Sequence, residues 1–497
     1  MPFNPTLRKS FLILYILFFT INAEAQTVTV EMGYGSGVFT AGDTIHIYAK
    51  EENLTEAFDH WSGDTLWLED PSEWHSKVVV PNRDIQLKAN YIQIPKDAQL
   101  QFERLQGYDT IKPVLYYFPS DPKKTKALVW LFHGTGGNFQ TLPSQVDGYL
   151  NIKRLIANGY AVAISECDEA TYRNDFSGDG NIRWNYNLIN GTNPDMLNHI
   201  MFMEYFKAKG WMRPGLPVFG WGFSAGGVFA LTNGPLMKFN KGVSFCGIGG
   251  KAVGDLSTMP SMWSLGSNDN HPDVGKEGND TARINYEKMT DRGVCAFLYT
   301  LTPSPFYPEY FRRIKGIDST LSVGIYNEMK FAGAINNKNM MALFPDELKI
   351  KVLANPAQYP SISSLNTDQI EELEKMMIIM NAGHIFHSHY TGKVIQFFEE
   401  ECDGLSTENS DLKNQQDPLL FPNPCYDHLT LTSSEMAGKE VCLRIYSIQG
   451  NIDIEKHFSS FPKTLLMDIY ELHSGYKIIS LQDNLGYVQK GSFIKNE

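Results

Sequence analysis

Residues 217–227 read PVFGWGFSAGG, and this stretch decides the fold. Its first part, residues 217–221, is typical of a buried β-strand, and an apolar helix is expected to begin near Ala225. The two elements are joined by the pattern G-x-S-x-G, which places Ser224 on a tight turn. The flanking glycines let the strand and the helix approach closely, so the serine hydroxyl is lifted out of the sheet. The helix N-terminus beside it favours negative charge that develops there.

A second glycine-rich motif lies upstream and also follows an apolar run. Residues 127–132 are continuously apolar and lead into HGTGGN at residues 133–138. A helical stretch over 146–157 and another buried strand at 160–165 come next. From about residue 96 onward, strands therefore alternate with helices, and this alternation predicts a mainly parallel sheet.

Taken together, the two motifs resemble the α/β-hydrolase fold over roughly residues 105–300 and 381–402. That fold places H-G-x-x-G after its third strand and G-x-S-x-G after its fifth, and the motifs occur here in this order. A chance glycine-rich turn would not account for both. The predicted fold class is α/β: an α/β-hydrolase fold with a mainly parallel sheet and a helical lid insertion, flanked by two small all-β modules.

The resemblance implies a serine esterase and gives roles to individual positions. Ser224 would attack an acyl carbonyl, and the oxyanion would be held by the backbone N–H groups of Ala225 and Thr135. His133 is expected to be structural in this motif. The prediction includes no cofactor.

The carboxylate of the triad is expected after the strand at 262–266. The residues that follow, 267–270, resemble the G-x-x-D turn that supplies it, so Asp269 is the first choice and Asp273 the alternative. A carboxylate here would orient the imidazole and stabilise its charged form. A helix N-cap or a surface aspartate is the competing interpretation of either residue.

The general base should follow in the chain order Ser, Asp, His. No histidine occurs in residues 302–310, just after the strand at 294–301, and the next ones are His384, His387 and His389. His384 follows a glycine and precedes an apolar residue, which best resembles the family's G-H pattern, so it is assigned as the base. His387 is the alternative.

Two other patterns raise the question of a metal. The spacing H-x-x-H-x-H from His384 to His389 also occurs in zinc sites, but it lacks a nearby second set of ligands, so no metal is predicted. His387 and His389 are expected at the pocket rim or on the surface. Residues 175–181 resemble the start of a calcium loop, yet Tyr186 occupies the twelfth position, where such a loop needs glutamate.

The late histidine leaves an insertion at residues 302–381. It is rich in aromatic residues and methionine, and helices are expected at 319–334 and 367–377. Because both of its ends return to the catalytic rim, we interpret it as a lid that covers the site and excludes water. The alternative is a peripheral excursion whose aromatic side chains form a small core of their own.

The N-terminus has the layout of a signal peptide over residues 1–25. Two basic residues, Arg8 and Lys9, precede an apolar run at 11–21, and AEA at 23–25 supplies an A-x-A cleavage site. The run is too short to span a bilayer, which takes about 20 apolar residues. Export is therefore expected, with no membrane-spanning segment in the mature chain.

Residues 26–95 alternate apolar and polar positions between glycine-rich turns, which predicts a small β module. The strings GSG at 35–37 and WSGD at 61–64 resemble the divergent internalin-B-type repeat module of bacterial surface proteins. The resemblance implies a spacer or a binding appendage. The tryptophans of this module are candidates for stacking on sugar rings, although burial is expected at least for Trp61.

A linker at 403–419 precedes a second β module at 420–497, in which short alternating strands are expected. The strings FPNP at 421–424, IYSIQG at 445–450 and GSFIK at 491–495 resemble the C-terminal sorting domain of type IX secretion in Bacteroidetes. The resemblance implies passage across the outer membrane by the type IX secretion machinery, followed by release or surface attachment.

Composition sets the outer limits on function. The 497 residues include 43 basic and 56 acidic side chains, for a formal charge of -13. So acidic a chain is a poor binder of nucleic acid, because phosphate binding needs a positive patch. Six cysteines without a C-x-x-C pair are too few for a disulfide scaffold, and Cys246 is expected to be a buried thiol.

These observations predict a secreted serine hydrolase that cleaves carboxylic esters through an acyl-enzyme. The strings HGTGGN and GFSAGG are similar to those of secreted feruloyl, acetyl-xylan and polyester esterases. The resemblance implies feruloyl or acetyl esters of plant polysaccharide, or polyesters, as substrates. The alternatives are a peptidase of the same fold and a surface binding protein with a degenerate hydrolase domain.

Overall fold

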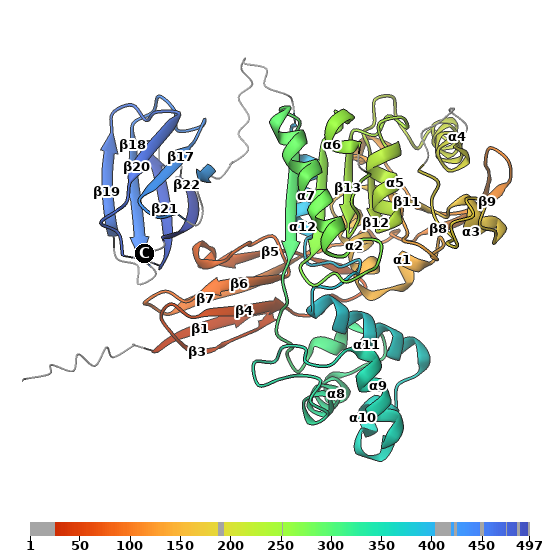
Figure 1. Ribbon diagram of the computed structural model, residues 1–497, viewed down its shortest axis with the longest axis horizontal. Coiled ribbons are helices and arrows are strands. Elements are labelled where there is room, and N and C mark those ends of the chain that lie inside the picture. Colours follow the sequence, from red (N-terminus) through yellow and green to blue (C-terminus); the bar gives the residue numbers. More distant parts are fainter. Residues whose placement is uncertain are drawn as a thin grey trace, which may run out of the picture.

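The computed structural model describes residues 25–186, 193–250, 252–402, 419–421, 425–447, 452–473, 475–484 and 488–495. The expected signal peptide up to residue 24, the linker at 403–418, and the motif residues 422–424 and 448–450 lie outside these ranges. Figure 1 shows a large domain in yellow and green, a β module in red, a helical insertion in teal and a C-terminal β module in blue. The domain boundaries at 95, 402 and 420 remain a prediction.

The large domain is built on an eight-stranded sheet in the order β15-β14-β13-β12-β10-β11-β9-β8. The strands from β10 to β15 pair in parallel, whereas β8 and β9 run antiparallel at one edge. This confirms the predicted mainly parallel sheet. In chain order β10 is its third strand and β12 its fifth. The strands are β8 (Gln101–Gln106), β9 (Ile111–Tyr117), β10 (Leu128–Phe132), β11 (Ala161–Ser165), β12 (Val218–Phe223), β13 (Lys241–Phe245), β14 (Ser261–Gly266) and β15 (Ala296–Leu301).

Helices cover both faces of this sheet, which is why its central strands are buried along almost their whole length. One face packs against α2 (Val146–Ala157) and α12 (Thr391–Glu399), and the other against α4 (Pro194–Ala208), α5 (Ala225–Asn233) and α7 (Gly275–Asp291). Every residue of β10 and β11 is buried. The shorter helices of this domain are α1 (Thr141–Ser144), α3 (Asp168–Tyr172) and α6 (Val253–Leu256).

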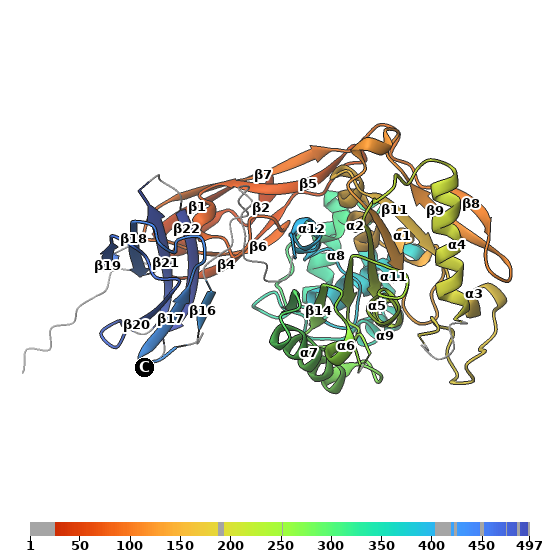
Figure 2. The same ribbon diagram turned by 90° about the horizontal axis from the view of Figure 1, so that it is seen from above.

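The red module consists of two small sheets, β3-β1-β7-β5 and β2-β4-β6. Its three tryptophans are buried, with at most 7% of each exposed, so stacking on sugar rings is wrong for all of them. Figure 2 shows β5 and β7 extending along one side of the molecule toward the large domain. The strands are β1 (Ala25–Glu31), β2 (Gly33–Tyr34), β3 (Gly37–Thr40), β4 (Thr44–Ala49), β5 (Glu56–Gly63), β6 (His75–Val79) and β7 (Ile85–Gln93).

The insertion at 302–381 packs against the red module. Its buried aromatic and methionine side chains join those of the module in one hydrophobic core. At the junction the rings of Tyr48 and Tyr307 stack at 4.2 Å, and the Tyr48 hydroxyl donates to Pro305 O at 2.6 Å. The expected helices are α8 (Ser319–Phe331) and α11 (Thr367–Met380), and α9 (Pro345–Ala354) and α10 (Pro360–Ser363) lie between them. The lid interpretation gains no support, because most of the insertion's aromatic residues are buried in this shared core.

The C-terminal module is a sandwich of two antiparallel sheets, β16-β17-β20 and β19-β18-β21-β22. Leu431, Leu443, Ile479 and Phe493 are fully buried between them. Within the ranges that the structure describes, no helix is long and apolar enough to cross a membrane. The strands are β16 (Leu419–Phe421), β17 (His428–Thr432), β18 (Val441–Ser447), β19 (Ile452–Phe458), β20 (Thr464–Asp468), β21 (Gly475–Asp483) and β22 (Val488–Lys495).

One disulfide, which was not predicted from the sequence, links the residue before β15 to the end of the large domain after α12. Cys295, before β15, is bonded to Cys402, after α12, across 107 positions of sequence. Closing so long a loop restricts the unfolded chain, so Cys295→Ser should lower the free energy of unfolding by about 2–4 kcal/mol. Urea titrations of the two proteins measure this difference. Cys442→Ser, which removes a free and half-buried thiol, is the control. Alkylation of Cys295 and Cys402 in the folded chain without reductant would contradict the bond.

Candidate active site

Ser224 lies between β12 and α5 in a backbone conformation that few residues adopt. Its φ is 53° and its ψ is -119°, and its backbone N–H donates to Phe245 O at 2.8 Å. A non-glycine residue in such a conformation costs on the order of 1–3 kcal/mol. The turn keeps this conformation because β12 and α5, the elements on either side of it, are packed in the core around the sheet.

The glycines around Ser224 are required by close approach. A Cβ on Gly222 would come within 2.1 Å of the carbonyl of Gly226, and one on Gly226 would come within 2.3 Å of Phe132 O. Larger residues at either position would push the helix away from the strands β10 and β12. The pattern requires glycine at these positions because the backbones of the strand and the helix are in direct contact, with no side chain between them.

The structure brings Ser224, His384 and Asp269 together, although they are far apart in sequence. His384 Nε2 lies 3.0 Å from Ser224 Oγ, and His384 Nδ1 lies 2.7 Å from Asp269 Oδ2. The side chain of Asp269 is fully buried and that of His384 is 12% exposed. The other oxygen of Asp269 accepts from the backbone N–H of His271 at 3.0 Å. The carboxylate is thus fixed on both sides, and it fixes the imidazole in turn.

The end of β14 positions Asp269 beside the segment that carries His384. Asn268 N donates to Ala382 O at 3.0 Å, and Asp269 N donates to Gly266 O at 3.2 Å. A Cβ on Gly266 would lie 2.5 Å from Ala382 O, so only glycine lets the two segments pass this closely. Consequently Asp269 and His384 meet at the carboxyl edge of the parallel sheet, next to the serine turn.

The loop after β10 is held by the buried ring of His133. Its Nδ1 lies 2.7 Å from Gly134 O, and its Nε2 accepts from the backbone N–H of Cys167 at 3.2 Å. Burial lowers the pKa of His133 to about 4, so the ring stays neutral. The Trp184 indole donates to His133 O at 2.8 Å. His133 therefore orients the loop that carries Thr135, and it does not contact Ser224 in the described set of bonds.

Two buried carboxylates, neither of them marked by a sequence motif, support this loop from behind. Glu169 accepts from the backbone N–H groups of Ser177 and Arg183, at 3.0 and 2.9 Å. Asp195 accepts from those of Asp168 and Asn185, at 2.6 and 2.8 Å. Burial raises the pKa of Asp195 to about 7. The two side chains set the path of residues 168–185, which packs beside the loop of Thr135.

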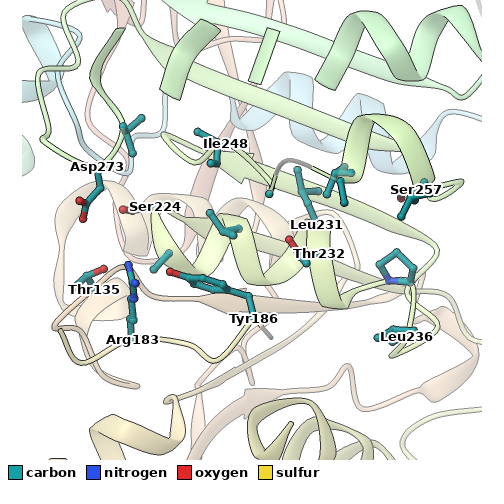
Figure 3. A pocket seen from close by; sticks show the side chains of 18 residues that line it. Thr135, Arg183, Tyr186, Ser224, Leu231, Thr232, Leu236, Ile248, Ser257 and Asp273 are labelled. Atoms are coloured by element: carbon teal, nitrogen blue, oxygen red, sulfur yellow. The ribbon is translucent and has the colours of Figure 1, made fainter. Parts of the chain in front are cut away.

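A cavity of about 420 Å³ opens directly beside Ser224. Figure 3 shows Ser224, Thr135 and Arg183 at one end, and Leu236 and Ser257 at the other. Most of the lining is apolar and comes from α5, α6 and the loop between β13 and α6. None of the lining residues belongs to the insertion at 302–381. They are Thr135, Arg183, Tyr186, Ser224, Ala225, Val228, Leu231, Thr232, Pro235, Leu236, Ile248, Gly250, Ala252, Val253, Leu256, Ser257, Asp273 and Val274.

The alternatives to His384 and Asp269, His387 and Asp273, have no bond to Ser224 or His384 among the described residues. The ring of His387 is buried and its Nε2 contacts Ser264 Oγ at 3.1 Å, on the far side of β14 from Ser224. His389 is also buried and contacts His75 of the red module, so the expectation that these two histidines lie at the rim or surface is wrong. Asp273 lines the cavity, and its described bond is from its backbone N–H to His271 Nδ1 at 3.2 Å.

His271 is a neighbour of the site that the sequence interpretation missed. Its ring stacks on that of His384, with 4.3 Å between the ring centroids. Burial, followed by the effect of His384, lowers the pKa of His271. A neutral ring in this place packs against the imidazole without adding charge. The signal was available, since His271 lies two positions after Asp269, but no motif marks it.

Two groups of side chains place metal-binding atoms near one another in the described residues. The first is Cys246 with Asp269 and His384, but burial raises the pKa of the Cys246 thiol to about 12, which keeps it protonated. The second is Cys442, Glu455 and His457 on the surface of β18 and β19, where Arg444 pairs with Glu455 at 2.6 Å. In the first group His384 is already bonded to Asp269 and Ser224, and in the second Glu455 is bonded to both Arg444 and His457.

The loop at 175–181 closes on itself. The carboxylate of Asp175 accepts from the backbone N–H groups of Gly178 and Gly180, both at 2.7 Å, and from the hydroxyl of Ser177. Asp179 pairs with Arg183. The acidic side chains that would bind calcium are therefore engaged within the loop.

Comparison with protein families identifies one part of the chain. Residues 419–495 match the model of the secretion system C-terminal sorting domain. This match confirms the predicted sorting module and indicates export by type IX secretion to the cell surface or beyond. No curated protein matches the chain.

Among solved structures, 417 chains match. A serine hydrolase without lid from Xanthomonas campestris is 12% identical, with 41% of this chain and 84% of that chain covered and a TM-score of 0.29. A mutant feruloyl esterase module from Clostridium thermocellum, complexed with sinapinate, is 15% identical, with coverage of 42% and 86% and a TM-score of 0.29. Poly(aspartic acid) hydrolase-1 from Sphingomonas sp. KT-1 is 17% identical, with coverage of 41% and 91% and a TM-score of 0.31.

The buried histidines make the site region sensitive to acid. His199 lies behind the loop of His133, where its Nδ1 contacts Asp195 O at 2.6 Å and its Nε2 contacts Ser165 Oγ at 2.9 Å. Burial lowers its pKa from 6.5 to about 3. Below pH 6.5 the unfolded chain therefore binds a proton that the folded chain does not, and His199 removes stability as the pH falls.

His199→Gln should accordingly reduce the pH dependence of stability. Between pH 6 and 4.5, the free energy of unfolding should fall less steeply in the variant than in the wild type, by up to about 1.4 kcal/mol per pH unit. The measurement is urea unfolding at several pH values. Comparing slopes cancels groups such as Asp195, whose raised pKa acts in the opposite direction. Equal slopes would show that His199 is protonated alike in both states.

Proposed function

We propose that this chain is a secreted serine hydrolase that cleaves carboxylic esters through an acyl-enzyme. The observation that carries the proposal is the continuous contact from Ser224 Oγ through the His384 imidazole to the buried Asp269 carboxylate. The three side chains occur in the order Ser, Asp, His on a mainly parallel sheet, which is the order of the α/β-hydrolases. The sorting domain supports a site of action outside the cell.

In the first half-reaction, His384 Nε2 takes the proton of Ser224 Oγ as this oxygen bonds to the ester carbonyl carbon. Asp269 holds the opposite ring nitrogen and stabilises the imidazolium that forms. The negative charge on the carbonyl oxygen is received by the N–H groups of Ala225 and Thr135. Ala225 is the first residue of α5, so its N–H belongs to the unpaired donors of the helix start. The C–O bond of the ester then breaks, and His384 gives its proton to the departing alcohol.

In the second half-reaction, water replaces the alcohol. His384 takes a proton from the water as its oxygen attacks the acyl carbon, and the same two N–H groups again receive the negative charge. The bond to Ser224 Oγ breaks, the proton returns to Ser224, and the free carboxylic acid leaves. No residue changes its role between the halves except that His384 alternates between base and acid.

The cavity favours a bulky apolar acyl group over acetyl. Ala225 and Thr135, whose backbone N–H groups are the proposed oxyanion donors, both line the cavity. The carbonyl carbon of a substrate would therefore lie at the end of the cavity next to Ser224. A volume of about 420 Å³ falls within the range of sites that enclose whole small molecules. A hydroxycinnamoyl group would fill it with its ring against apolar side chains. Feruloyl-type esters are therefore our preferred substrates, ahead of acetyl esters.

The contact between His384 and Ser224 argues against the degenerate binding protein. A buried, positive-φ serine in contact with a carboxylate-bound imidazole costs stability, which a pure binding surface would have no reason to retain. No described feature specifically favours a peptidase.

Labelling by a fluorophosphonate tests the nucleophile. The wild-type chain should react at Ser224, and Ser224→Ala should abolish labelling because no other hydroxyl in the described ranges contacts an imidazole that a carboxylate holds. Ser165→Ala is a matched control: Ser165 also contacts a histidine, at 2.9 Å, but it is fully buried and this pair lacks a carboxylate partner in the described bonds. Labelling that persists in Ser224→Ala, or that disappears only in Ser165→Ala, would refute the assignment.

Substitution of Asp269 tests the triad. Asp269→Asn should lower kcat for an activated ester on the order of 10⁴-fold, because the amide holds the imidazole in the wrong tautomer. Steady-state hydrolysis of a p-nitrophenyl ester measures this loss. If Asp273→Asn caused the large loss and Asp269→Asn did not, the acid would have to be reassigned.

The acyl preference can be measured with a substrate series. p-Nitrophenyl esters of acetate, hexanoate and a hydroxycinnamate should show kcat/KM rising with the size of the acyl group, because each buried CH₂ contributes about 0.8 kcal/mol. Ile248→Trp, which would fill part of the cavity, should reduce kcat/KM for the two large esters and leave acetate hydrolysis nearly unchanged. A flat series, or equal losses on all three esters, would place the acyl group elsewhere.

A further inference from the structure

The red β module contacts the segment that carries His384 through buried bonds. The Trp74 indole N–H lies 3.1 Å from both the carbonyl oxygen and the hydroxyl of Ser388. One residue earlier, Glu73 accepts from the backbone N–H groups of Gly392 and Lys393, at 3.1 and 2.7 Å. All of these groups except Lys393 lie among the buried residues or the buried backbone of α12. The module therefore packs over residues 388–393, which follow His384 in the chain.

The bonds from Glu73 satisfy the start of helix α12. Gly392 and Lys393 are its second and third residues, and their N–H groups have no partner within the helix. Burial raises the pKa of Glu73 to about 8, so the side chain caps the helix through its two accepting oxygens rather than through a full negative charge. Here the capping group comes from another part of the chain, more than 300 positions away in sequence. The beginning of α12, and with it the end of the segment 384–391, is fixed by the module.

The approach is so close that only glycine fits at position 392. A Cβ there would lie 2.5 Å from Ser72 O and 3.0 Å from Glu73 Oε1. The backbone of the module and the backbone of α12 thus touch directly. A loosely tethered appendage would leave room for a side chain between them.

Helix α2 and the insertion complete the enclosure of the segment. Asp147 of α2 accepts from the backbone N–H and the hydroxyl of Ser388, at 2.7 and 2.6 Å, and Asn151 donates to His387 O at 3.1 Å. The guanidinium of Arg313, from the insertion, lies 3.4 Å from the centre of the Trp74 ring. Trp74 is therefore itself held in place from the opposite side.

The same helix ties down the module. Lys153 pairs with Glu52 at 2.9 Å, both side chains being less than a tenth exposed, and Arg154 donates to Asp59 O at 2.9 Å and to Ser72 O at 2.5 Å. A buried ion pair of this kind is costly unless its geometry is fixed. Consequently α2 fixes the module and the histidine segment relative to each other.

From these contacts we propose that the N-terminal β module positions the catalytic histidine. Glu73 and Trp74 are positioning residues: they touch neither Ser224 nor the cavity, and they act through Ser388 and the first turn of α12 on the placement of His384. This goes beyond the spacer or binding appendage that the sequence implied. The inference rests on the proposed function only in taking His384 as the catalytic base. The bracing of its segment by the module does not depend on any activity.

The test compares Trp74→Phe with Trp67→Phe in the full-length protein. Both changes remove an indole N–H from a buried ring of the same module, but the Trp67 N–H has no hydrogen-bond partner among the described residues. Trp74→Phe should lower kcat on the order of 10- to 100-fold with KM nearly unchanged, because His384 loses its fixed geometry. Trp67→Phe should leave both constants near the wild-type values. Glu73→Gln, which turns one acceptor into a donor facing a backbone N–H, should behave like Trp74→Phe.

Hydrogen exchange separates failure of this inference from failure of the proposed function. Measured by mass spectrometry, the amides of residues 385–393 should exchange faster in Trp74→Phe and Glu73→Gln than in Trp67→Phe, whether or not the protein hydrolyses esters. Equal exchange in this segment across the three variants, or equal kcat in Trp74→Phe and Trp67→Phe, would overturn the positioning role. Absence of Ser224-dependent labelling in the wild type would instead overturn the proposed function, while the exchange data would still decide the bracing.

Discussion

The approach of His384 Nε2 to Ser224 Oγ, at 3.0 Å between residues 160 positions apart, sets the demands on the rest of the fold. Ser224 is fixed locally, because the sheet and α5 meet on either side of it. Asp269 is also fixed locally, by the turn at the end of β14. His384 lies in a segment without regular structure between α11 and α12, and the turn after β14 contacts the residues just before it. Its placement must therefore come from tertiary contacts.

Those contacts explain how the insertion and the red module belong together. Each presents a face of aromatic and aliphatic side chains that could not remain in water, and each buries it against the other. The insertion returns to the large domain through α11, directly before the histidine, and the module reaches the same place through Glu73 and Trp74. The chain between β15 and His384 thus adds an element that the module can pack on. The same contacts therefore bury the insertion and hold the segment that carries His384.

The parts of the fold that depend on local pattern could be predicted from the sequence. Ser224 and its glycines require a backbone contact, and α2 begins at Val146, where the apolar pattern places it. The places of β10 and β12 as the third and fifth strands of the sheet in chain order followed from the two motifs. The choice of Asp269 and His384 followed from the turn and the G-H pattern, and the structure brings both to Ser224 without settling their chemical roles.

What could not be predicted depends on long-range contact. An aromatic-rich insertion is equally compatible with a lid and with a shared core, because composition does not state what a face packs against. Nothing in the local sequence indicates that His387 and His389 are buried, because their partners Ser264 and His75 are distant in sequence. The same holds for Asp195 and for the pairing of Cys295 with Cys402: each acts through a partner that no local pattern reveals.

The position of the insertion also bears on how the proposed hydrolase would keep water from its reaction. With no insertion residue lining the cavity, the substrate itself must displace water from the apolar walls along α5 and α6. A large acyl group does so and strengthens the bonds to the oxyanion by lowering the local dielectric. A small one leaves part of the cavity hydrated. Selectivity for the acyl group and the rate of its transfer would then have a common origin. The loop of Thr135 can meet this demand because His133, Glu169 and Asp195 hold it before any substrate arrives.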